Sequence, residues 1–457
     1  MKKITPLLNS VLLGSTLLSS IRLNSERLNF ERVKKASSRL ASKPIQSIQS
    51  IQSTQSLQPI LGTTVAAFVA VTMFALTPFE AKADDFSNWI DGVQVEARAN
   101  GIDEVYIAAL DDLTPNETVR RLAARQPEYI KPIWEYLDHM ITPNRLKVGN
   151  EKLEAYSDIL AELEAEYGVP RQVLVTIWGM ETNYGTIKGS FPVLEALASL
   201  GYEGRRAKFG RQQLLAALEI LQAGDVELKD FKGSWAGAMG HTQFIPTTYL
   251  AYAVDATNDG KRDIWNNPHD ALGSTASYLK VSGWKTGLPW GVQVKLPTGF
   301  DYSWANLKVK KQANTWMALG VEAQTGSIDP DWGKTALYLP AGHRGPAFLV
   351  TKNFFAILRY NTAPAYGLSV GELSDRLAGK SDSNYNWPIE ARPLLPKEIK
   401  EMQAILVKAG YEIGAVDGVP GPLTREAVLQ FQKQNGILAD GYATPGFLQE
   451  LRKTVRK

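Results

Sequence analysis

The chain contains no cysteine among its 457 residues. It therefore has no disulfide, no thiolate ligand for a metal, no cysteine nucleophile and no lipid-modified N-terminal cysteine, and the redox compartment stays open. An excess of positive charge is also lacking outside the first part of the chain. Residues 1–83 hold ten of the 50 Lys and Arg and three of the 47 Asp and Glu, so residues 84–457 carry a net charge of −4. This mildly acidic body argues against a nucleic-acid-binding surface, which works by neutralising phosphates.

The first 83 residues do not have the sequence pattern of a folded domain. Residues 45–58 repeat a polar IQS-like unit, and residues 60–76 form an almost continuous apolar run before an A-x-A sequence that ends at Ala83. An apolar run followed by A-x-A is typical of a secretory leader, so we expect export with cleavage after Ala83. The run is also nearly long enough to cross a bilayer, and a second weak leader pattern begins at Met1. An uncleaved membrane anchor therefore remains an alternative.

The body, residues 84–380, has a mainly helical pattern. After residue 289 the pattern changes to strands separated by turns rich in Gly, Pro and Trp. Residues 381–396 are rich in Asn and Pro and indicate a linker. Residues 397–457 form a last compact unit. Helices are predicted over 150–167, 191–200, 209–223, 270–283, 354–360, 399–409 and 424–434, and strands over 291–296, 336–339 and 347–351.

The stretch VLVTIWGMETNYG, residues 173–185, places one acidic residue, Glu181, at the end of an apolar helical segment. Pro170 lies where a helix would begin. A carboxyl group held among such apolar neighbours is poorly solvated, which raises its pKa and lets it act as a general acid near neutral pH. The alternative is a glutamate on a solvated helix end, because structural carboxylates are commoner than catalytic ones.

Four segments, taken in order, resemble the B-type lytic murein transglycosylases. They are ETNYG at 181–185, GAMGHTQFIPTTY at 237–249, DATNDGKRDIWNNPHDAL at 255–272 and NFFAILRYNTAPAYGLSV at 353–370. The resemblance covers about residues 84–380. The last unit resembles the three-helix peptidoglycan-binding module through its LVKAGY, AVDGVPGPLTREAVLQFQKQNGI and LADG sequences.

This resemblance implies a lysozyme-like helical catalytic domain, with its core at about residues 150–290 and a small β-containing segment, followed by the three-helix module. It also implies cleavage of the β-1,4 bond between N-acetylmuramic acid and N-acetylglucosamine without water, which leaves a 1,6-anhydro ring. One carboxyl group suffices, since it protonates the glycosidic oxygen and then accepts the proton of the C6 hydroxyl that attacks C1. Hydrolases need a second carboxylate, and residues 181–185 contain none, although one could come from elsewhere. By this resemblance Glu181 is both acid and base.

The resemblance also implies a set of glycan-binding residues. Gln243 offers a donor and an acceptor to an acetamido group or a sugar hydroxyl, beside glycines that allow close backbone approach. Tyrosine rings can stack on sugars, although aromatic residues are more often core, an alternative that stays open for Tyr184 and Tyr278. His241 is interpreted as a wall residue and not as a base. The candidate substrate-binding residues are Tyr184, Arg205, Arg206, Ser234, Gln243, Tyr278, Tyr360, Asn361 and Tyr366, the two arginines as partners for peptide carboxylates.

Residues 255–270 resemble an EF-hand loop. Asp255, Thr257 and Asp259 stand at positions 1, 3 and 5, and the Lys261 carbonyl at position 7. The glutamate expected at position 12 is missing, and the resemblance makes Asp270 the closing ligand, one residue later than expected. A structural Ca²⁺ ion, weakly held, is thus one interpretation, and a turn that never binds metal is the other. No cofactor is needed for the chemistry itself.

The sequence leaves three functions in competition. The first is an exported, periplasmic transglycosylase acting on peptidoglycan strands, with the last unit as a wall tether that raises the local substrate concentration. The second is a hydrolase that uses water, as goose-type lysozymes do. The third is a non-catalytic protein that binds the cell wall. Such a protein would be expected to lack the catalytic acid, yet Glu181 is present. For the last unit, a small helical domain packed on the body is the alternative to a tether.

Overall fold

The computed structural model describes residues 80–124, 131–380 and 385–454. Residues 1–79, most of the predicted leader, and linker residues 381–384 lie outside the described residues. In the described part of the chain, no helix combines the length and the apolar character needed to cross a membrane.

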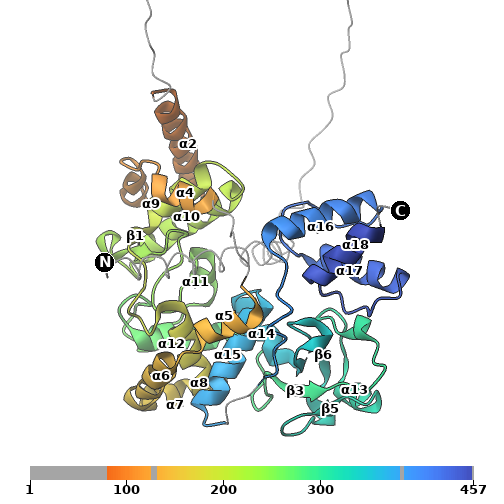
Figure 1. The fold of residues 1–457 in the computed structure, drawn as a ribbon. Helices are drawn as coiled ribbons and strands as arrows, with labels where there is room; N and C mark the ends of the chain where they lie inside the picture. Colours follow the sequence, from red (N-terminus) through yellow and green to blue (C-terminus); the bar gives the residue numbers. More distant parts are fainter. Residues whose placement is uncertain (1–79, 125–130, 381–384, 455–457) are drawn as a thin grey trace, which may run out of the picture.

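The body is mainly helical, as predicted (Figure 1). Its helices are α2 (Glu80–Ala99), α3 (Glu104–Ile107), α4 (Glu117–Ala124), α5 (Ile133–Met140), α6 (Pro143–Ala155), α7 (Ser157–Tyr167), α8 (Arg171–Thr182), α9 (Val193–Tyr202), α10 (Ala207–Ala223), α11 (Pro246–Tyr252), α12 (Pro268–Val281), α13 (Ala313–Ala318), α14 (Lys352–Tyr360) and α15 (Pro364–Leu377).

Two helix predictions differ from the structure. The single helix expected over residues 150–167 is two helices, α6 and α7, because the backbone leaves helical geometry at Tyr156 (φ −114°, ψ 24°). Helix α15 was not predicted at all. Its sequence contains Gly367 and Gly371, which lower helix propensity, but here glycine is required. A Cβ at Gly371 would lie 2.4 Å from the Trp290 ring.

The helical body has two apolar cores. One joins α2, α4, α9 and α10, and the other joins α5, α6, α7, α8, α12, α14 and α15. Helix α8 runs through the second core, and every residue from Val173 to Thr182 is buried. Tyr360, the last residue of α14, packs against both cores. The end of α14 thus lies where the two cores meet.

The β-containing segment is a small antiparallel sheet with strand order β4-β6-β7-β3-β5. Its strands are β3 (Gly291–Lys295), β4 (Lys311–Gln312), β5 (Glu322–Ala323), β6 (Lys334–Tyr338) and β7 (Ala347–Val350), and a separate pair is β1 (Phe191–Pro192) with β2 (Lys232–Gly233). The three longer strands match the predicted ones. One face of the sheet forms its own core around the buried Trp316.

The C-terminal module has its own core and three helices, α16 (Pro396–Lys408), α17 (Pro422–Gln434) and α18 (Pro445–Thr454). It lies against the β segment in Figure 1. The Asp440 carboxylate accepts a hydrogen bond from the His343 backbone N–H at 3.0 Å, and Arg425 donates to the Ala305 carbonyl at 2.7 Å. Trp387, within the predicted linker, packs beside Trp134 of the body. The module is therefore docked on the body in this structure.

Candidate active site

Glu181 lies in the last turn of α8, and its side chain is buried with 6% exposure. The helix ends at Asn183, whose backbone is left-handed (φ 49°), and Tyr184 and Gly185 continue in the same region of φ. The Thr182 hydroxyl accepts from the Gly185 N–H at 2.9 Å and closes this turn. The sequence prediction of a carboxyl group at the end of a buried helix is confirmed.

The carboxyl group of Glu181 has a single hydrogen-bond partner among the described residues. Its Oε1 accepts from the Tyr366 hydroxyl at 2.7 Å, and its Oε2 is buried without a partner. Burial raises the pKa of Glu181 to about 7, and the bond from Tyr366 opposes part of that rise. Near neutral pH the group is thus poised between its acid and its base form.

Three tyrosines lie near enough to the carboxyl group for its charge to raise their pKa values. Tyr366 comes from α15 and Tyr360 from the end of α14, and the Tyr360 hydroxyl donates to the Thr242 carbonyl. Tyr136, on α5, is the third, since the charge of Glu181 adds to the effect of burial in raising the pKa of Tyr136. Tyr136 was missed in the sequence because it lies in no recognised motif, about 45 residues before Glu181.

Two of the candidate stacking residues lie in the core. The Tyr184 ring is 4% exposed and fits against Gly149 and Gly179, where a Cβ would come within 2.7 Å of it. Its hydroxyl donates to the Arg145 carbonyl at 2.6 Å. Tyr278 is 5% exposed, packs against the rings of Phe244, Tyr252 and Tyr360, and donates to the Arg359 carbonyl. Neither ring offers a free face to a sugar, so the geometry favours the core alternative for both.

The Gly-rich segment supplies a tight loop beside α8. Gln243 has a left-handed backbone (φ 55°), and its Nε2 donates to the carbonyls of Gly240 at 3.0 Å and Lys188 at 3.2 Å. The Ser234 hydroxyl accepts from the Ala238 N–H at 3.0 Å. Both side chains therefore also hold the loop, in addition to the substrate contacts predicted for them.

The remaining residues predicted to bind substrate differ in their exposure to solvent. Asn361 is buried, and its Oδ1 accepts from the Ala363 N–H at 3.1 Å, which shapes the turn that leads into α15 and Tyr366. Arg205 is exposed. Arg206 is half-buried and lies over the Trp235 ring, 5.6 Å from its centroid. Their predicted contacts with peptide carboxylates stay predictions.

The EF-hand-like loop is closed by its own hydrogen bonds. Asp270, fully buried, accepts from the N–H groups of Ala256 at 2.9 Å and Asp263 at 2.9 Å, and Asp255 accepts from the Gly260 N–H at 2.7 Å. Over the described residues, no group of three or more acidic or histidine side chains is placed to hold a metal ion. In this arrangement the carboxylates of the loop accept backbone N–H groups, and calcium binding stays a prediction.

A comparison with protein-family models decides the family. The model described as Transglycosylase SLT domain matches residues 85–375, and a peptidoglycan binding domain matches residues 396–451. This chain belongs to the transglycosylase SLT domain family. The matched ranges fall close to the predicted body and terminal unit.

The transglycosylase has relatives of known name and structure. It is 30% identical to membrane-bound lytic murein transglycosylase B of Escherichia coli over 291 residues, which are 62% of this chain and 77% of that protein. SltB3 of Pseudomonas aeruginosa, solved with NAG-anhNAM-pentapeptide, is 47% identical with a TM-score of 0.76, over 80% of this chain and 99% of its own. The E. coli lytic transglycosylase Slt35, solved with calcium, is 29% identical with a TM-score of 0.55, over 67% and 94% of the two chains.

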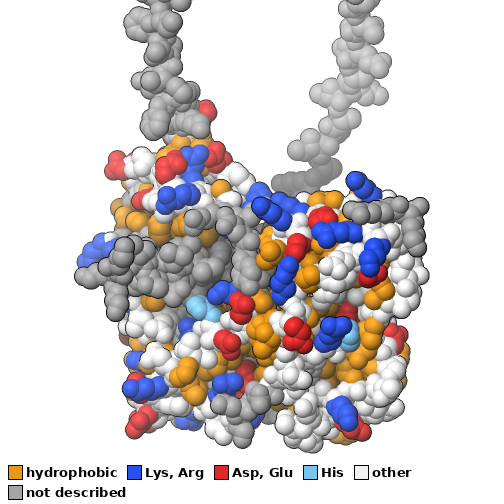
Figure 2. All heavy atoms as spheres, viewed as in Figure 1, with side chains coloured by type: hydrophobic (Ala, Val, Ile, Leu, Met, Phe, Trp, Pro, Cys, Tyr) orange, Lys and Arg blue, Asp and Glu red, His pale blue; other side chains and the backbone are white. Residues whose placement is uncertain are grey.

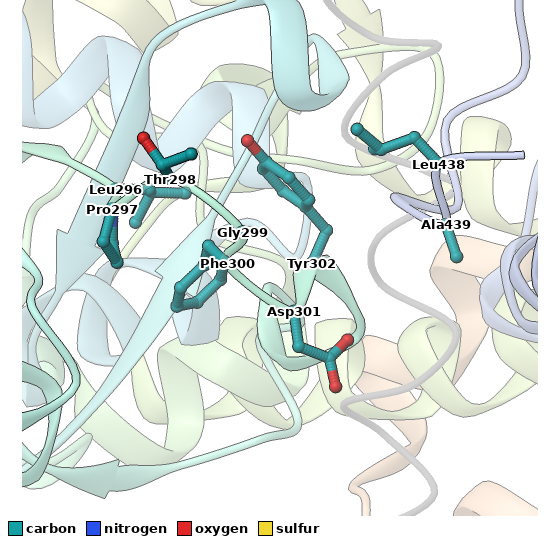
Figure 3. Close-up of a pocket in the computed structure, with 9 residues that line it drawn as sticks. All are labelled: Leu296, Pro297, Thr298, Gly299, Phe300, Asp301, Tyr302, Leu438 and Ala439. Atoms are coloured by element: carbon teal, nitrogen blue, oxygen red, sulfur yellow. The ribbon is translucent and has the colours of Figure 1, made fainter.

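A pocket of about 490 Å³ lies at another place in the transglycosylase, where the β segment meets the C-terminal module (Figure 3). Phe300, Asp301 and Tyr302 line one side, and Leu438 and Ala439 of the module line the other. It contains none of the residues around Glu181. On the face shown in Figure 2, acidic and basic side chains are interspersed over both parts.

Proposed function

We propose that this transglycosylase is a lytic enzyme of peptidoglycan in which Glu181 is both the acid and the base. The observation that carries the proposal is the buried, singly hydrogen-bonded carboxyl group with a pKa raised to about 7. Such a group holds a proton near neutral pH and can also release it.

The two oxygens of Glu181 have different roles in this mechanism. Because Oε1 accepts from Tyr366, the proton is carried by Oε2. Oε2 protonates the glycosidic oxygen as the bond from that oxygen to C1 of N-acetylmuramic acid breaks. The resulting carboxylate, stabilised by Tyr366, then takes the proton of the C6 hydroxyl as O6 bonds to C1. The products are a free 4-hydroxyl and a 1,6-anhydro ring, and the acid is restored.

The surroundings of Glu181 support this route over hydrolysis. A hydrolase would need a second carboxylate about 5 to 9.5 Å from the first. Within the described residues, the shift in the pKa of Glu181 arises from burial and from Tyr366, without a contribution from another acidic group. A lone acid that also serves as base needs no such partner.

Mass analysis of the products tests the proposal. Purified sacculi treated with the wild-type enzyme should release 1,6-anhydro muropeptides, lighter by one water than the reducing products of a muramidase. Glu181→Gln should release none. Glu219→Gln, which makes the same chemical change on the exposed face of α10, serves as the matched control and should keep full activity. Reducing products, or lysis by the Glu181→Gln variant, would contradict the proposal.

The C-terminal module binds peptidoglycan in this proposal and keeps the catalytic domain at its substrate. Its match to a peptidoglycan binding domain supports this function. Co-sedimentation with sacculi tests it. The full chain carrying Glu181→Gln should sediment with the wall, and the same variant ended after residue 380 should sediment less. Equal sedimentation would favour the alternative, a module that only packs on the body.

An enzyme of peptidoglycan acts outside the cytoplasm, and the leader pattern supports export to the periplasm. We propose cleavage after Ala83, with an uncleaved anchor as the alternative. Helix α2 begins at Glu80 in the unprocessed chain, so cleavage would remove only its first four residues. N-terminal sequencing of protein recovered from the periplasm distinguishes the two, since an anchored form would stay in the membrane fraction with a longer N-terminus.

A further inference from the structure

The backbone of His241 connects α8 to the segment that contains Ile264. Its carbonyl oxygen accepts from the Thr182 hydroxyl at 2.6 Å, and its N–H donates to the Ile264 carbonyl at 2.9 Å. Thr182 directly follows Glu181 in the last turn of α8. The loop that carries His241 is thus fixed to the helix next to the catalytic carboxyl group.

The side chain of His241 makes a second connection to the same helix. Trp178, one turn before Glu181, donates from its indole Nε1 to His241 Nδ1 at 3.0 Å. The two rings meet edge to face, with their centroids 5.5 Å apart, and both residues are buried. Because an indole N–H can only donate, Nδ1 must accept, and the neutral imidazole carries its proton on Nε2.

The turn after α8 packs directly on the imidazole. A Cβ at Gly185 would lie 2.3 Å from Cε1 and Nδ1 of His241, so only glycine fits there. Gly185 also has a left-handed backbone (φ 83°), which glycine adopts readily. His241 therefore contacts α8 and its terminal turn through its carbonyl, its Nδ1 and its ring edge.

The surroundings keep the imidazole neutral. Burial and the charge of Lys188 lower the pKa of His241 to about 4, Lys152 acts in the same direction, and Asp263 opposes them. At the pH where Glu181 works, the lone pair on Nδ1 is thus available to Trp178.

We infer that His241 is a positioning residue for the reaction: the hydrogen bond that it accepts from Trp178 fixes the last turn of α8. This turn shields Glu181 from water and keeps its carboxyl group in contact with Tyr366. His241 itself touches no reacting atom. The inference rests on the proposed role of Glu181. It goes beyond the interpretation of His241 as a wall residue, because it assigns the effect of the side chain to the carboxyl group and not to the sugar.

Two variants of nearly equal shape test this inference. His241→Asn keeps an acceptor, Oδ1, in the place of Nδ1, whereas His241→Leu has a methyl group there. We expect His241→Asn to keep at least half of kcat, and His241→Leu to lose about tenfold in kcat with KM changed less than twofold, because misplacing a reacting group lowers the rate more than binding. The assay measures release of anhydro products from a soluble glycan of alternating N-acetylglucosamine and N-acetylmuramic acid.

The pH profile separates positioning from a loss of structure. If the turn loosens, water reaches Glu181 and its pKa falls toward its ordinary value, so the alkaline limb of the kcat profile of His241→Leu should move to lower pH. His241→Asn should keep the wild-type limb. If His241→Leu does not fold, Trp178→Phe removes the same hydrogen bond from the donor side and should show the same loss and the same shift.

Equal kcat values for the Asn and Leu variants, or a loss in the Leu variant without a shift of the limb, would overturn the inference. These outcomes differ from failure of the proposed function. If Glu181→Gln remained active, the catalytic assignment would fail, whatever His241 does.

Discussion

Glu181 and Asp270 are both buried carboxyl groups, and burial raises the pKa of each. They differ in the donors that surround them. Asp270 accepts hydrogen bonds from three backbone N–H groups, those of Ala256, Thr257 and Asp263. Glu181 accepts one, from the Tyr366 hydroxyl, and leaves Oε2 without a partner among the described residues.

This difference separates a structural carboxylate from a reactive one. Backbone N–H groups stabilise the ionised form of Asp270 and oppose the effect of burial. Both oxygens of Asp270 thus already accept hydrogen bonds. Glu181 lacks these donors, so its ionised form is disfavoured and one oxygen stays available. The number of donors, and not burial alone, thus indicates which acid can do chemistry.

The largest effect is expected at Asp270. Asp270→Asn replaces one accepting oxygen by an N–H₂ group that faces backbone donors, so at least one N–H is left unpaired. We expect the free energy of unfolding to fall by about 4 kcal/mol, since each buried unpaired group costs roughly 1–3 kcal/mol and the two donors also repel. Urea unfolding measures it. A loss below about 1 kcal/mol would mean that the bonds to Asp270 do not hold the loop.

The matching substitution, Glu181→Gln, should raise the free energy of unfolding, whereas Asp270→Asn lowers it. Because the folded pKa is about 7 and the ordinary value 4.5, the folded state binds the proton more tightly, and wild-type stability falls as pH rises from about 4.5 to 7. Glu181→Gln stays neutral and escapes this loss. It should be more stable than the wild type by about 3 kcal/mol at pH 8.

Below pH 4.5 the two proteins should have nearly equal stability, because the wild-type carboxyl group is then protonated in both the folded and the unfolded state. Thermal unfolding at pH 4 and pH 8 gives the comparison. An advantage of Glu181→Gln that does not grow with pH would show that Glu181 is solvated in the folded enzyme.

The contrast between these two acids could be predicted only in part from the sequence. The apolar run before Glu181 indicates burial, because hydrophobic neighbours in a helix are local information. The donors around Asp270 could not be predicted in the same way. Ala256 and Thr257 lie on the far side of a loop whose closure depends on three-dimensional packing. The EF-hand spacing predicts which residues could bind a metal, but not which backbone N–H groups donate to Asp270.

The same dependence on three-dimensional packing explains which tyrosines of the site could be predicted. Tyr366 and Tyr360 were found through their motifs, whereas Tyr136 reaches the site only because α5 packs against α15. Tyr184 lies three residues from Glu181 in sequence, yet it points into the core, because α8 ends there in a left-handed turn. Most helices and the three longer strands follow from local periodicity. Which face of a turn meets the substrate does not.

Removing the single hydrogen-bond donor to Glu181 tests how far that bond controls the pKa of the carboxyl group. Tyr366→Phe keeps the ring and deletes the hydroxyl. Because that hydrogen bond favours the ionised carboxylate, its loss should raise the pKa of Glu181 above about 7 and move the alkaline limb of the kcat profile to higher pH. The base step loses stabilisation of the carboxylate, so we expect kcat to fall roughly tenfold.

The control for this change is Tyr278→Phe, which removes a buried hydroxyl that donates to a backbone carbonyl in the core. It should leave the pH profile where it is. A Tyr366→Phe profile that coincides with the wild type would show that the hydroxyl does not act on the acid.

The smallest effect on stability is expected from the addition of calcium. If the loop at residues 255–270 binds the ion, it must share carboxylates that already accept backbone N–H groups, so the dissociation constant should be no better than about 1 mM, the weak end for such loops. By mass action, 1 mM Ca²⁺ would then raise the free energy of unfolding by only about 0.4 kcal/mol. Thermal unfolding with CaCl₂ against equal MgCl₂ measures this, and Asp255→Asn is the control that should abolish it. An increase of several degrees in the unfolding temperature that Asp255→Asn removes would contradict the expectation. It would mean that the loop rearranges into a metal site, and that its carboxylates differ less from Glu181 than this structure indicates.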